Sequence, residues 1–246
     1  MAEFFPYRKD LRHPAWQEVA AFTGSRFRPE WCHGNDAKIH EEFSHYPDAA
    51  TFYRETDVYL YHGPAFFMEG IKRPYYAVLF RLLANLDASI LDYGGGCGDD
   101  ALLFASLGFN VTLADIPSRS LQFAKWRCQR RGQSISIFEI GKDDDNTLRD
   151  VDDDRFMIVW CCDVLEHLLP SEHRGLIDTL CKLGQTVFLV LVNDPEADGR
   201  VHYPVDLDGL TQYAGTKESV WACNFYQGRT RLLIIGGLAS IMNPNL

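Results

Sequence analysis

Short apolar runs alternate with helical patterns from about residue 86 onward. Five of these runs are nearly continuous in apolar residues, as strands are when both faces of their sheet are covered. They occupy residues 89–93, 110–115, 134–140, 155–162 and 185–193. The segments between them show helical spacing, and the first two end in glycine, which commonly terminates a helix. This alternation predicts right-handed crossovers and a parallel sheet.

The two ends of the chain depart from the alternation. Residues 218–238 hold two strand-like runs about a Gln-Gly-Arg turn, which predicts an antiparallel hairpin at a sheet edge. Residues 1–85 are rich in Tyr, Phe, His and Pro, and we expect them to form an N-terminal helical and aromatic cap. Residues 86–246 then form an α/β domain with a Rossmann-like, doubly wound sheet of seven strands, mostly parallel, that ends in the antiparallel hairpin. Its ligand crevice should lie at the carboxyl ends of the first strands.

Composition narrows the choice of partners. The chain has 246 residues and a formal net charge of -10, which argues against broad electrostatic binding to nucleic acid or to anionic membranes. The basic segment 125–131 closes a helical pattern, and we interpret it as a solvated helix end, with contact to nucleic acid as a minor alternative. Seven cysteines without C-x-x-C spacing indicate neither a disulfide framework nor a zinc site. With a polar N-terminus and no membrane-length apolar run, we expect a cytoplasmic protein with a small-molecule partner, and the sequence indicates no oligomeric state.

A glycine-rich turn directly follows the first predicted strand. The stretch ILDYGGGCGDD at 90–100 contains the pattern D-x-G-x-G-x-G. Glycine is retained where φ is positive or where a ligand approaches the backbone. Asp115 ends the second predicted strand, where an acid can accept hydrogen bonds from both hydroxyls of a ribose. Together the turn and the acid predict a nucleoside-type ligand.

Two cofactors compete for this turn. Residues 96–101 spell the dinucleotide pattern G-x-G-x-x-A, which suits NAD(P). Asp99 and Asp100 open the following helix, however, where they would repel a pyrophosphate. Asp92 precedes the glycines, where a carboxylate suits a cationic group. S-adenosylmethionine carries a sulfonium and an ammonium group and no phosphate, so the charge pattern favours it.

The stretches ILDYGGGCGDDALLFASLGFNVTLADI and FMIVWCCDVLEHL together resemble class I S-adenosylmethionine-dependent methyltransferases. The resemblance is greatest to the small-molecule group that includes ubiquinone-biosynthesis O-methyltransferases, and it covers residues 86–195. It implies contacts to the methionine part from the glycine turn, to the ribose from Asp115, to the adenine from Asp143 or Asp144, and to the cofactor carboxylate from Arg73. The cofactor-binding residues that we expect are Asp92, Gly94, Gly95, Gly96, Asp115, Ile116, Asp143, Asp163 and Arg73.

The segment DVLEH follows the fourth predicted strand and places Asp163, Glu166 and His167 at helical positions i, i+3 and i+4. Three interpretations are open. Asp163 and Glu166 can form a capping box that has no chemical role. His167, with Glu166 beside it, can face the transferred methyl group as a general base. The two carboxylates and the imidazole can also hold a divalent metal, although we assign no metal ligand.

Further candidates lie on the expected substrate side. Tyr61 and His62 precede Gly63-Pro64, a pair typical of turns, so we expect these two side chains to be presented to substrate. Aromatic residues of the cap can wall a pocket above the cofactor, or they can simply pack the cap onto the sheet. His202 and Tyr203, in the loop after the fifth strand, are candidates of lower rank.

The function that these patterns predict is methyl transfer from S-adenosylmethionine to an oxygen, nitrogen or carbon nucleophile of a small molecule. The candidate catalytic residues are His167, Glu166, Tyr61 and His62. Two alternatives stay open from the sequence: an NAD(P)-dependent oxidoreductase, and a non-catalytic scaffold with a methyltransferase-like fold.

Overall fold

The computed structural model describes residues 10–33, 36–83, 87–141, 156–194, 197 and 199–242. Its centre is a seven-stranded sheet with the strand order β3-β2-β1-β4-β5-β7-β6. The strands are β1 (Ser89–Tyr93), β2 (Asn110–Asp115), β3 (Ser136–Glu139), β4 (Phe156–Cys162), β5 (Gly184–Val192), β6 (Val220–Phe225) and β7 (Thr230–Gly236). Strand β7 pairs antiparallel with β5 and β6, and the other pairs are parallel. The predicted sheet and its C-terminal hairpin are confirmed.

Strand β4 shows why the apolar runs are continuous. Ile158 and Trp160 pack into a hydrophobic cluster on one face of the sheet, whereas Val159 and Cys161 pack into a second cluster on the other face. Successive side chains of a strand point to opposite faces, so both sets must be apolar when helices cover both faces.

Helices cover the two faces of the sheet and form the cap. They are α1 (Pro14–Thr23), α2 (Asp36–Phe43), α3 (Ala49–Glu55), α4 (Tyr59–Glu69), α5 (Arg73–Leu83), α6 (Asp99–Ser106), α7 (Arg119–Arg131), α8 (His173–Leu183), α9 (Leu207–Gly215) and α10 (Ala239–Met242). Helices α5, α6 and α7 contribute to the cluster on one face, and α8 and α9 contribute to the other. Within the described parts of the chain, no helix is long and apolar enough to cross a membrane.

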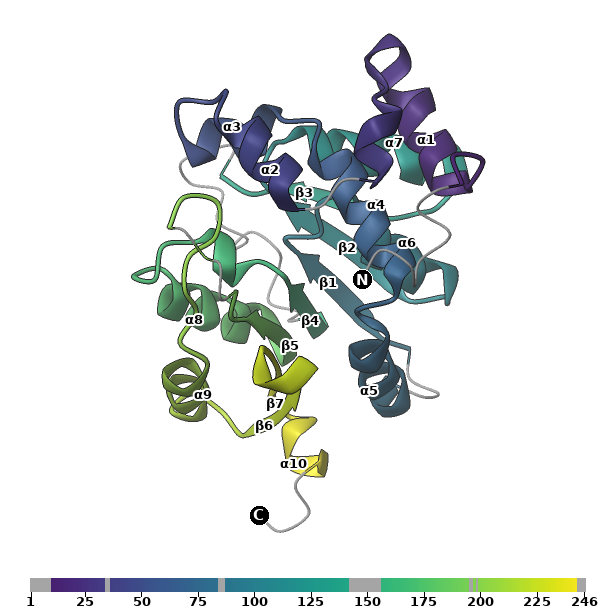
Figure 1. The fold of residues 1–246 in the computed structure, drawn as a ribbon. Helices are drawn as coiled ribbons and strands as arrows, with labels where there is room; N and C mark the ends of the chain where they lie inside the picture. The colour runs from purple at the N-terminus through teal and green to yellow at the C-terminus, as the bar shows by residue number, and fades with distance from the viewer. Residues whose placement is uncertain are drawn as a thin grey trace.

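The N-terminal cap has a hydrophobic core of its own. Helices α1, α2 and α3 lie at the end of the molecule away from the β6–β7 hairpin (Figure 1). Trp16, Phe52 and Tyr61 are buried in this core, and Phe123 of α7 is buried with them. Because α7 covers the sheet on one side and the cap on the other, it fixes the cap above the tips of the first strands.

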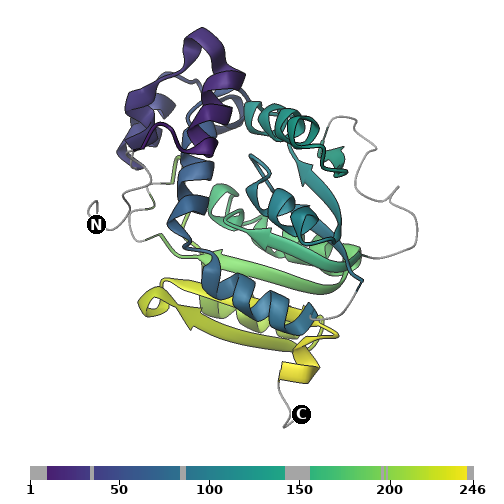
Figure 2. The ribbon, with the colours of Figure 1, turned by 90° about the vertical axis from the view of Figure 1, so that its right-hand side faces the viewer.

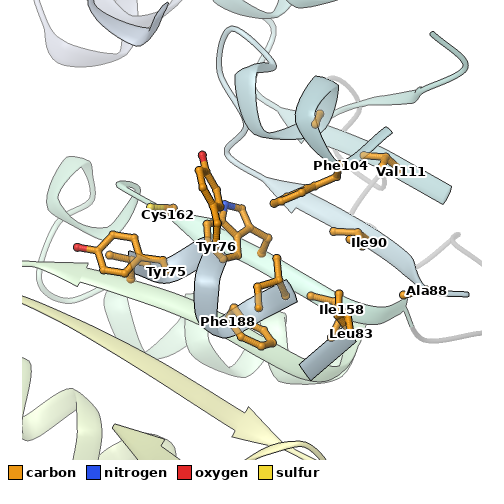
Figure 3. Packing of buried hydrophobic residues seen from close by; sticks show 14 of the residues in the cluster. Tyr75, Tyr76, Leu83, Ala88, Ile90, Phe104, Val111, Ile158, Cys162 and Phe188 are labelled. Carbon is orange, nitrogen blue, oxygen red and sulfur yellow. The ribbon is translucent and has the colours of Figure 1, made fainter. Parts of the chain in front are cut away.

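Helix α5 belongs to the core of the sheet although it precedes residue 86. It runs along one face of the sheet (Figure 2), and its residues Tyr75, Tyr76 and Leu83 are buried among strand residues (Figure 3). The Tyr76 ring stacks on Trp160 of β4 at a centroid distance of 5.6 Å. The domain boundary at residue 85 stays a prediction, with α5 packed against the sheet that we expected to begin after it.

The expected turn at Gly63-Pro64 is wrong, because both residues lie inside α4. Tyr61 is therefore not presented by a turn. Its ring packs against Phe27 and Trp31, and its hydroxyl accepts a hydrogen bond of 2.8 Å from the backbone N–H of Arg28.

The interpretation of residues 125–131 as a solvated helix end is also wrong in part. Arg127 is buried, with Nε 2.9 Å from Glu18 Oε2 and Nη2 2.7 Å from Asp99 Oδ1. Its Nη1 donates a hydrogen bond of 2.8 Å to the carbonyl of Cys97. Arg127 is covered because the cap packs against α7, a tertiary contact that the helical pattern alone does not reveal.

Candidate active site

Two structural features explain why glycine occupies the turn between β1 and α6: a positive φ, and the lack of room for a Cβ at some positions. Gly94, Gly96 and Gly98 have φ values of +73°, +51° and +75°, in the left-handed region that favours glycine. A Cβ on Gly94 would lie 2.4 Å from Val164, and one on Gly98 would lie 3.0 Å from Ala124. By contrast, apart from its chain neighbours, no atom of the described residues lies within 4 Å of the position that a Gly96 Cβ would take. Gly96 therefore borders space in which a ligand could approach the backbone.

Asp115 lies directly beside this open space. Its Oδ2 accepts a hydrogen bond of 2.6 Å from the Gly96 N–H, and its Oδ1 accepts one of 2.6 Å from the Ile116 N–H. Burial raises the pKa of Asp115 to about 6, and the two backbone hydrogen bonds partly oppose that rise. Each carboxylate oxygen retains a second lone pair. Asp115 can therefore accept hydrogen bonds from two ligand hydroxyls while it holds the turn.

Asp92 lies under the turn. A Cβ on Gly95 would lie 2.6 Å from Asp92 Oδ2, so the absence of a side chain at Gly95 leaves room for this carboxylate. Asp92 is buried, and its Oδ2 has no hydrogen-bond partner among the described residues. Burial, reinforced by the charge of Asp100, raises the pKa of Asp92 well above its ordinary value. A buried polar atom without a partner is uncommon in a native fold and is typical of a ligand site.

Asp99 and Asp100, which we expected to repel a pyrophosphate, are each paired with a protein cation. Asp99 pairs with Arg127 at 2.7 Å. Asp100 Oδ2 accepts hydrogen bonds from Lys72 Nζ at 2.9 Å and from Trp160 Nε1 at 2.8 Å. The case for a cationic ligand therefore depends on the other acids near the strand tips.

Lys72, and not Arg73, lies largely shielded from solvent near the strand tips. Its Nζ lies 2.9 Å from Asp100 Oδ2 and 3.5 Å from Asp163 Oδ2. Although burial lowers the pKa of Lys72, the charge of Asp100 and its neighbours raises that pKa well above its ordinary value. Arg73 is exposed and lies against Gly70. The sequence did not separate these adjacent cations, because the choice depends on where α5 begins.

The segment after β4 forms the short 3-10 helix η5 (Leu165–His167) and not the predicted helix start. Asp163 has a φ of +59°, and the N-cap position is Val164, which has no side-chain cap. The capping-box interpretation is therefore wrong. Asp163 lies instead beside Lys72, and a non-glycine residue with positive φ is a strained feature that clusters at functional sites.

Glu166 is the second buried acid of this segment. Only 4% of it is exposed, and its Oε2 has no hydrogen-bond partner among the described residues. Burial and the charge of Asp163 raise the pKa of Glu166 well above its ordinary value. Within the described residues, no group of three or more His, Cys, Asp or Glu side chains is arranged to hold a metal ion.

His167 lies between η5 and the cap. Its Nδ1 is 2.9 Å from the hydroxyl of Tyr53, which donates its proton to the carbonyl of Val201 at 2.6 Å. Because a hydroxyl has a single proton, His167 Nδ1 must carry the hydrogen in its contact with Tyr53, and Nε2 carries the lone pair. Burial, together with His202 and His62, lowers the pKa of His167 to about 3. His167 is thus a neutral imidazole near pH 7.

The remaining residues that the sequence proposed for the site lie either near His167 or in the core of the cap. The His202 ring lies 4.9 Å from the His167 ring, and the backbone N–H of Tyr203 donates to the Glu166 carbonyl at 2.7 Å. The His62 ring is 6.1 Å from that of Phe66. Tyr61 is buried in the cap core and is not brought to these residues. Asp143 and Asp144 lie outside the described residues.

Residues 90–184 of the chain match the family model described as "Methyltransferase domain". A magnesium protoporphyrin IX methyltransferase from Synechocystis PCC 6803 with bound S-adenosylmethionine has 16% sequence identity and a TM-score of 0.55, with 94% of this chain and 95% of that chain covered. An O-methyltransferase family protein from Burkholderia thailandensis has 14% identity and a TM-score of 0.56, with 93% and 70% covered. The PH0226 protein from Pyrococcus horikoshii OT3 has 15% identity and a TM-score of 0.55, with 68% and 90% covered. No curated protein sequence matches the chain.

Proposed function

We propose that the chain is a class I, S-adenosylmethionine-dependent methyltransferase that transfers the methyl group to a small-molecule acceptor. The match of residues 90–184 to a methyltransferase domain and the similarity of the fold to that of a methyltransferase with bound S-adenosylmethionine support this proposal. The observation that carries the proposal is the contact between Gly96 and Asp115. A ligand-facing glycine and a carboxylate with spare lone pairs lie together at the tips of β1 and β2. This arrangement lets a nucleoside lie close to the glycine backbone while its ribose hydroxyls reach the carboxylate.

The residues at the strand tips fit this cofactor group by group. Asp115 would accept hydrogen bonds from the ribose hydroxyls, with Ile116 beside it. Gly94, Gly95 and Gly96 would line the methionine part, near Asp92. Asp163 would lie beside the cationic groups of the methionine part, and Lys72 would take the place that we expected for Arg73 near the cofactor carboxylate. Opposite charges placed at the two ends of the methionine part would fix its orientation.

The acceptor is expected on the side of β4 and β5, under the cap. Tyr53, Tyr59 and His62 from the cap face His167 or one another through ring contacts of 5.2 to 6.3 Å. Such a wall of rings suits a compact organic molecule and excludes water from the reacting atoms. The net charge of -10 opposes a nucleic-acid acceptor. A magnesium protoporphyrin IX methyltransferase of similar fold also acts on a small molecule, as its name states.

Bound S-adenosylmethionine supplies an activated methyl group, so the protein is left with alignment, exclusion of water and, for some acceptors, removal of a proton. His167 is poorly suited to the last task, because its pKa of about 3 gives it little affinity for a proton near pH 7. Its neutral ring and its hydrogen bond to Tyr53 suit it to position the acceptor.

Calorimetry with S-adenosylmethionine and S-adenosylhomocysteine tests the proposal, with NADH as the comparison ligand. We expect the first two to bind and NADH not to bind. Asp115→Ala should abolish most of the affinity, whereas Asp208→Ala, at an exposed ion pair on α9, should leave it unchanged. Binding of NADH alone, or equal affinities in the wild type and Asp115→Ala, would overturn the cofactor site.

A further inference from the structure

Asp194 and His202 form a carboxylate–imidazole pair beyond the carboxyl end of β5. Asp194 Oδ2 lies 2.7 Å from His202 Nδ1. The two side chains are only 26% and 20% exposed, so the contact is partly shielded from solvent. The family-like motifs at the strand tips do not include this pair, and the sequence ranked His202 below His167.

The backbone on both sides of His202 is fixed. Val201 is fully buried in the cap core, and its carbonyl accepts the hydrogen bond from the Tyr53 hydroxyl. On the other side, the Tyr203 N–H donates to the carbonyl of Glu166 in η5. The His202 carbonyl itself accepts a hydrogen bond of 2.9 Å from Gly199. His202 is therefore attached to the cap and to the segment after β4, and it has a defined position between them.

The contact with Asp194 determines the chemistry of the His202 ring. A carboxylate can only accept a hydrogen bond, so Nδ1 of His202 carries the hydrogen, and Nε2 carries the lone pair in the neutral ring. The same contact fixes the orientation of the ring. His167 lies 4.9 Å away between ring centres, and the structure shows no carboxylate contact to it from the described residues. Burial and the neighbouring histidines oppose a positive charge on His167.

We propose that His202 is the general base of this enzyme, that Asp194 is its positioning residue, and that the group from which His202 takes the proton is a hydroxyl of the acceptor. The proposal rests on the proposed methyltransferase function. His202 Nε2 takes the proton of the acceptor hydroxyl. The acceptor oxygen forms a bond to the methyl carbon as the carbon–sulfur bond breaks, and the electron pair of that bond remains on sulfur. The proton passes from His202 to solvent after the products leave.

Two titratable groups contact the His202 ring: Asp194 after β5 and His167 in η5. His167 is in turn hydrogen-bonded to Tyr53 on α3 and lies near His62 on α4. The carbonyl of Glu166 in η5 accepts the hydrogen bond from the backbone N–H of the adjacent Tyr203.

The first test needs no acceptor. Nitrogen-15 NMR of the histidine rings, with S-adenosylhomocysteine present, reports which ring nitrogen carries the hydrogen when the His202 ring is neutral. We expect the Nδ1–H tautomer in the wild type and its loss in Asp194→Asn. His45→Asn, at an exposed histidine on the cap, is the matched control and should leave the His202 signals unchanged. A wild-type His202 with its hydrogen on Nε2 would overturn the proposal.

The second test measures methyl transfer to a panel of phenols, alcohols and primary amines by release of S-adenosylhomocysteine. His202→Asn should lower kcat for hydroxyl acceptors by roughly 10²- to 10⁴-fold, the usual contribution of a general base. It should also convert a pH profile with a plateau into one that keeps rising with pH. S-adenosylhomocysteine affinity should stay unchanged in His202→Asn. Two outcomes would refute this proposal: an unchanged kcat in a His202→Asn variant that still binds S-adenosylhomocysteine, or methylation of the amines alone. If the wild type does not bind S-adenosylhomocysteine, the methyltransferase function itself is refuted.

Discussion

Lys72 Nζ lies 2.9 Å from Asp100 Oδ2, and the two side chains are only 16% and 6% exposed. Tyr76 and Trp160 donate further hydrogen bonds to the same carboxylate, at 2.5 and 2.8 Å. The Asp100 carboxylate thereby connects the first turn of α6 to Lys72, before α5, and to Trp160 of β4. Asp100 also completes the negative charge preferred at a helix N-terminus.

Lys72→Met should destabilise the protein strongly, because it leaves Asp100 buried without its cation. Loss of one partner of a buried ion pair costs about 3 kcal/mol or more. Urea denaturation at pH 7 measures the change in the free energy of unfolding. We also expect weaker binding of S-adenosylhomocysteine, since Lys72 lies beside Asp163.

Two further variants isolate the cause. Lys217→Met removes a cation from an exposed pair with Asp178 and should have a much smaller effect. The double variant Lys72→Met with Asp100→Asn removes both charges and should recover part of the lost stability. If Lys72→Met unfolds at the same urea concentration as the wild type, the pair does not stabilise the fold.

Gly96→Ala should separate ligand binding from folding. Its Cβ would meet no atom within 4 Å, so the cost to stability is limited to a positive φ, about 1 kcal/mol. The same Cβ would occupy the space in which we place the cofactor. We therefore expect a large loss of S-adenosylhomocysteine affinity in calorimetry with little change in the urea midpoint.

Gly132→Ala is the matched control for this substitution. Gly132 ends α7 with a φ of +61°, and a Cβ there also meets no atom within 4 Å. The two variants share the backbone penalty and differ in position only. Equal affinities in Gly96→Ala and Gly132→Ala would show that the open space beside Gly96 is not the cofactor site.

The sheet was predictable because the apolar pattern that identifies each strand lies within that strand's own sequence. Strand β4 alternates between two buried faces, so its apolar run is readable without knowledge of its neighbours. The turn at Gly96 and the acid at Asp115 were found for a similar reason, since each follows directly from the end of a strand.

The cap and the acceptor side were not predictable in the same way. Whether Lys72 or Arg73 enters the site depends on the residue at which α5 begins, and boundaries of elements are poorly encoded in local sequence. Tyr61 is a core residue because α4 continues through Pro64, against the usual preference of proline. The contact of Asp194 with His202 arises from loop closure, which no periodic pattern records.

The partly buried His167 makes the free energy of unfolding depend on pH. Its folded pKa of about 3 lies below the ordinary value of 6.5, so between these values the unfolded chain binds a proton that the native protein does not. Protonation of His167 therefore costs no stability above pH 6.5. As the pH falls from 6.5 to about 3, the free energy of unfolding decreases by at most about 1.4 kcal/mol per pH unit.

His167→Asn should therefore reduce the difference in the free energy of unfolding between pH 7.5 and pH 5.0, even though the variant is less stable at pH 7.5. Urea denaturation at both values measures it. His45→Asn replaces an exposed histidine and should keep the wild-type difference. An unchanged difference in His167→Asn would mean that His167 is not kept neutral by burial.

Asp115 shows the opposite shift. Burial raises its folded pKa to about 6, from an ordinary value of 3.8. The native protein therefore binds more protons than the unfolded chain between these values, and this group lowers the stability as the pH rises from 3.8 to 6. Donors from a bound ribose would favour the ionised carboxylate and offset that cost.

Binding of S-adenosylhomocysteine should consequently release a proton from Asp115 near pH 6. Calorimetry between pH 5 and pH 8 should give an affinity that is constant above pH 7 and falls below pH 6, by roughly tenfold per pH unit at the steepest. Titration in two buffers with different ionisation enthalpies measures the released proton. Asp115→Asn should bind more weakly at pH 8 and lose the pH dependence, because its amide does not titrate. A wild-type affinity that stays constant from pH 5 to pH 8 would show that the Asp115 carboxylate does not contact the ligand.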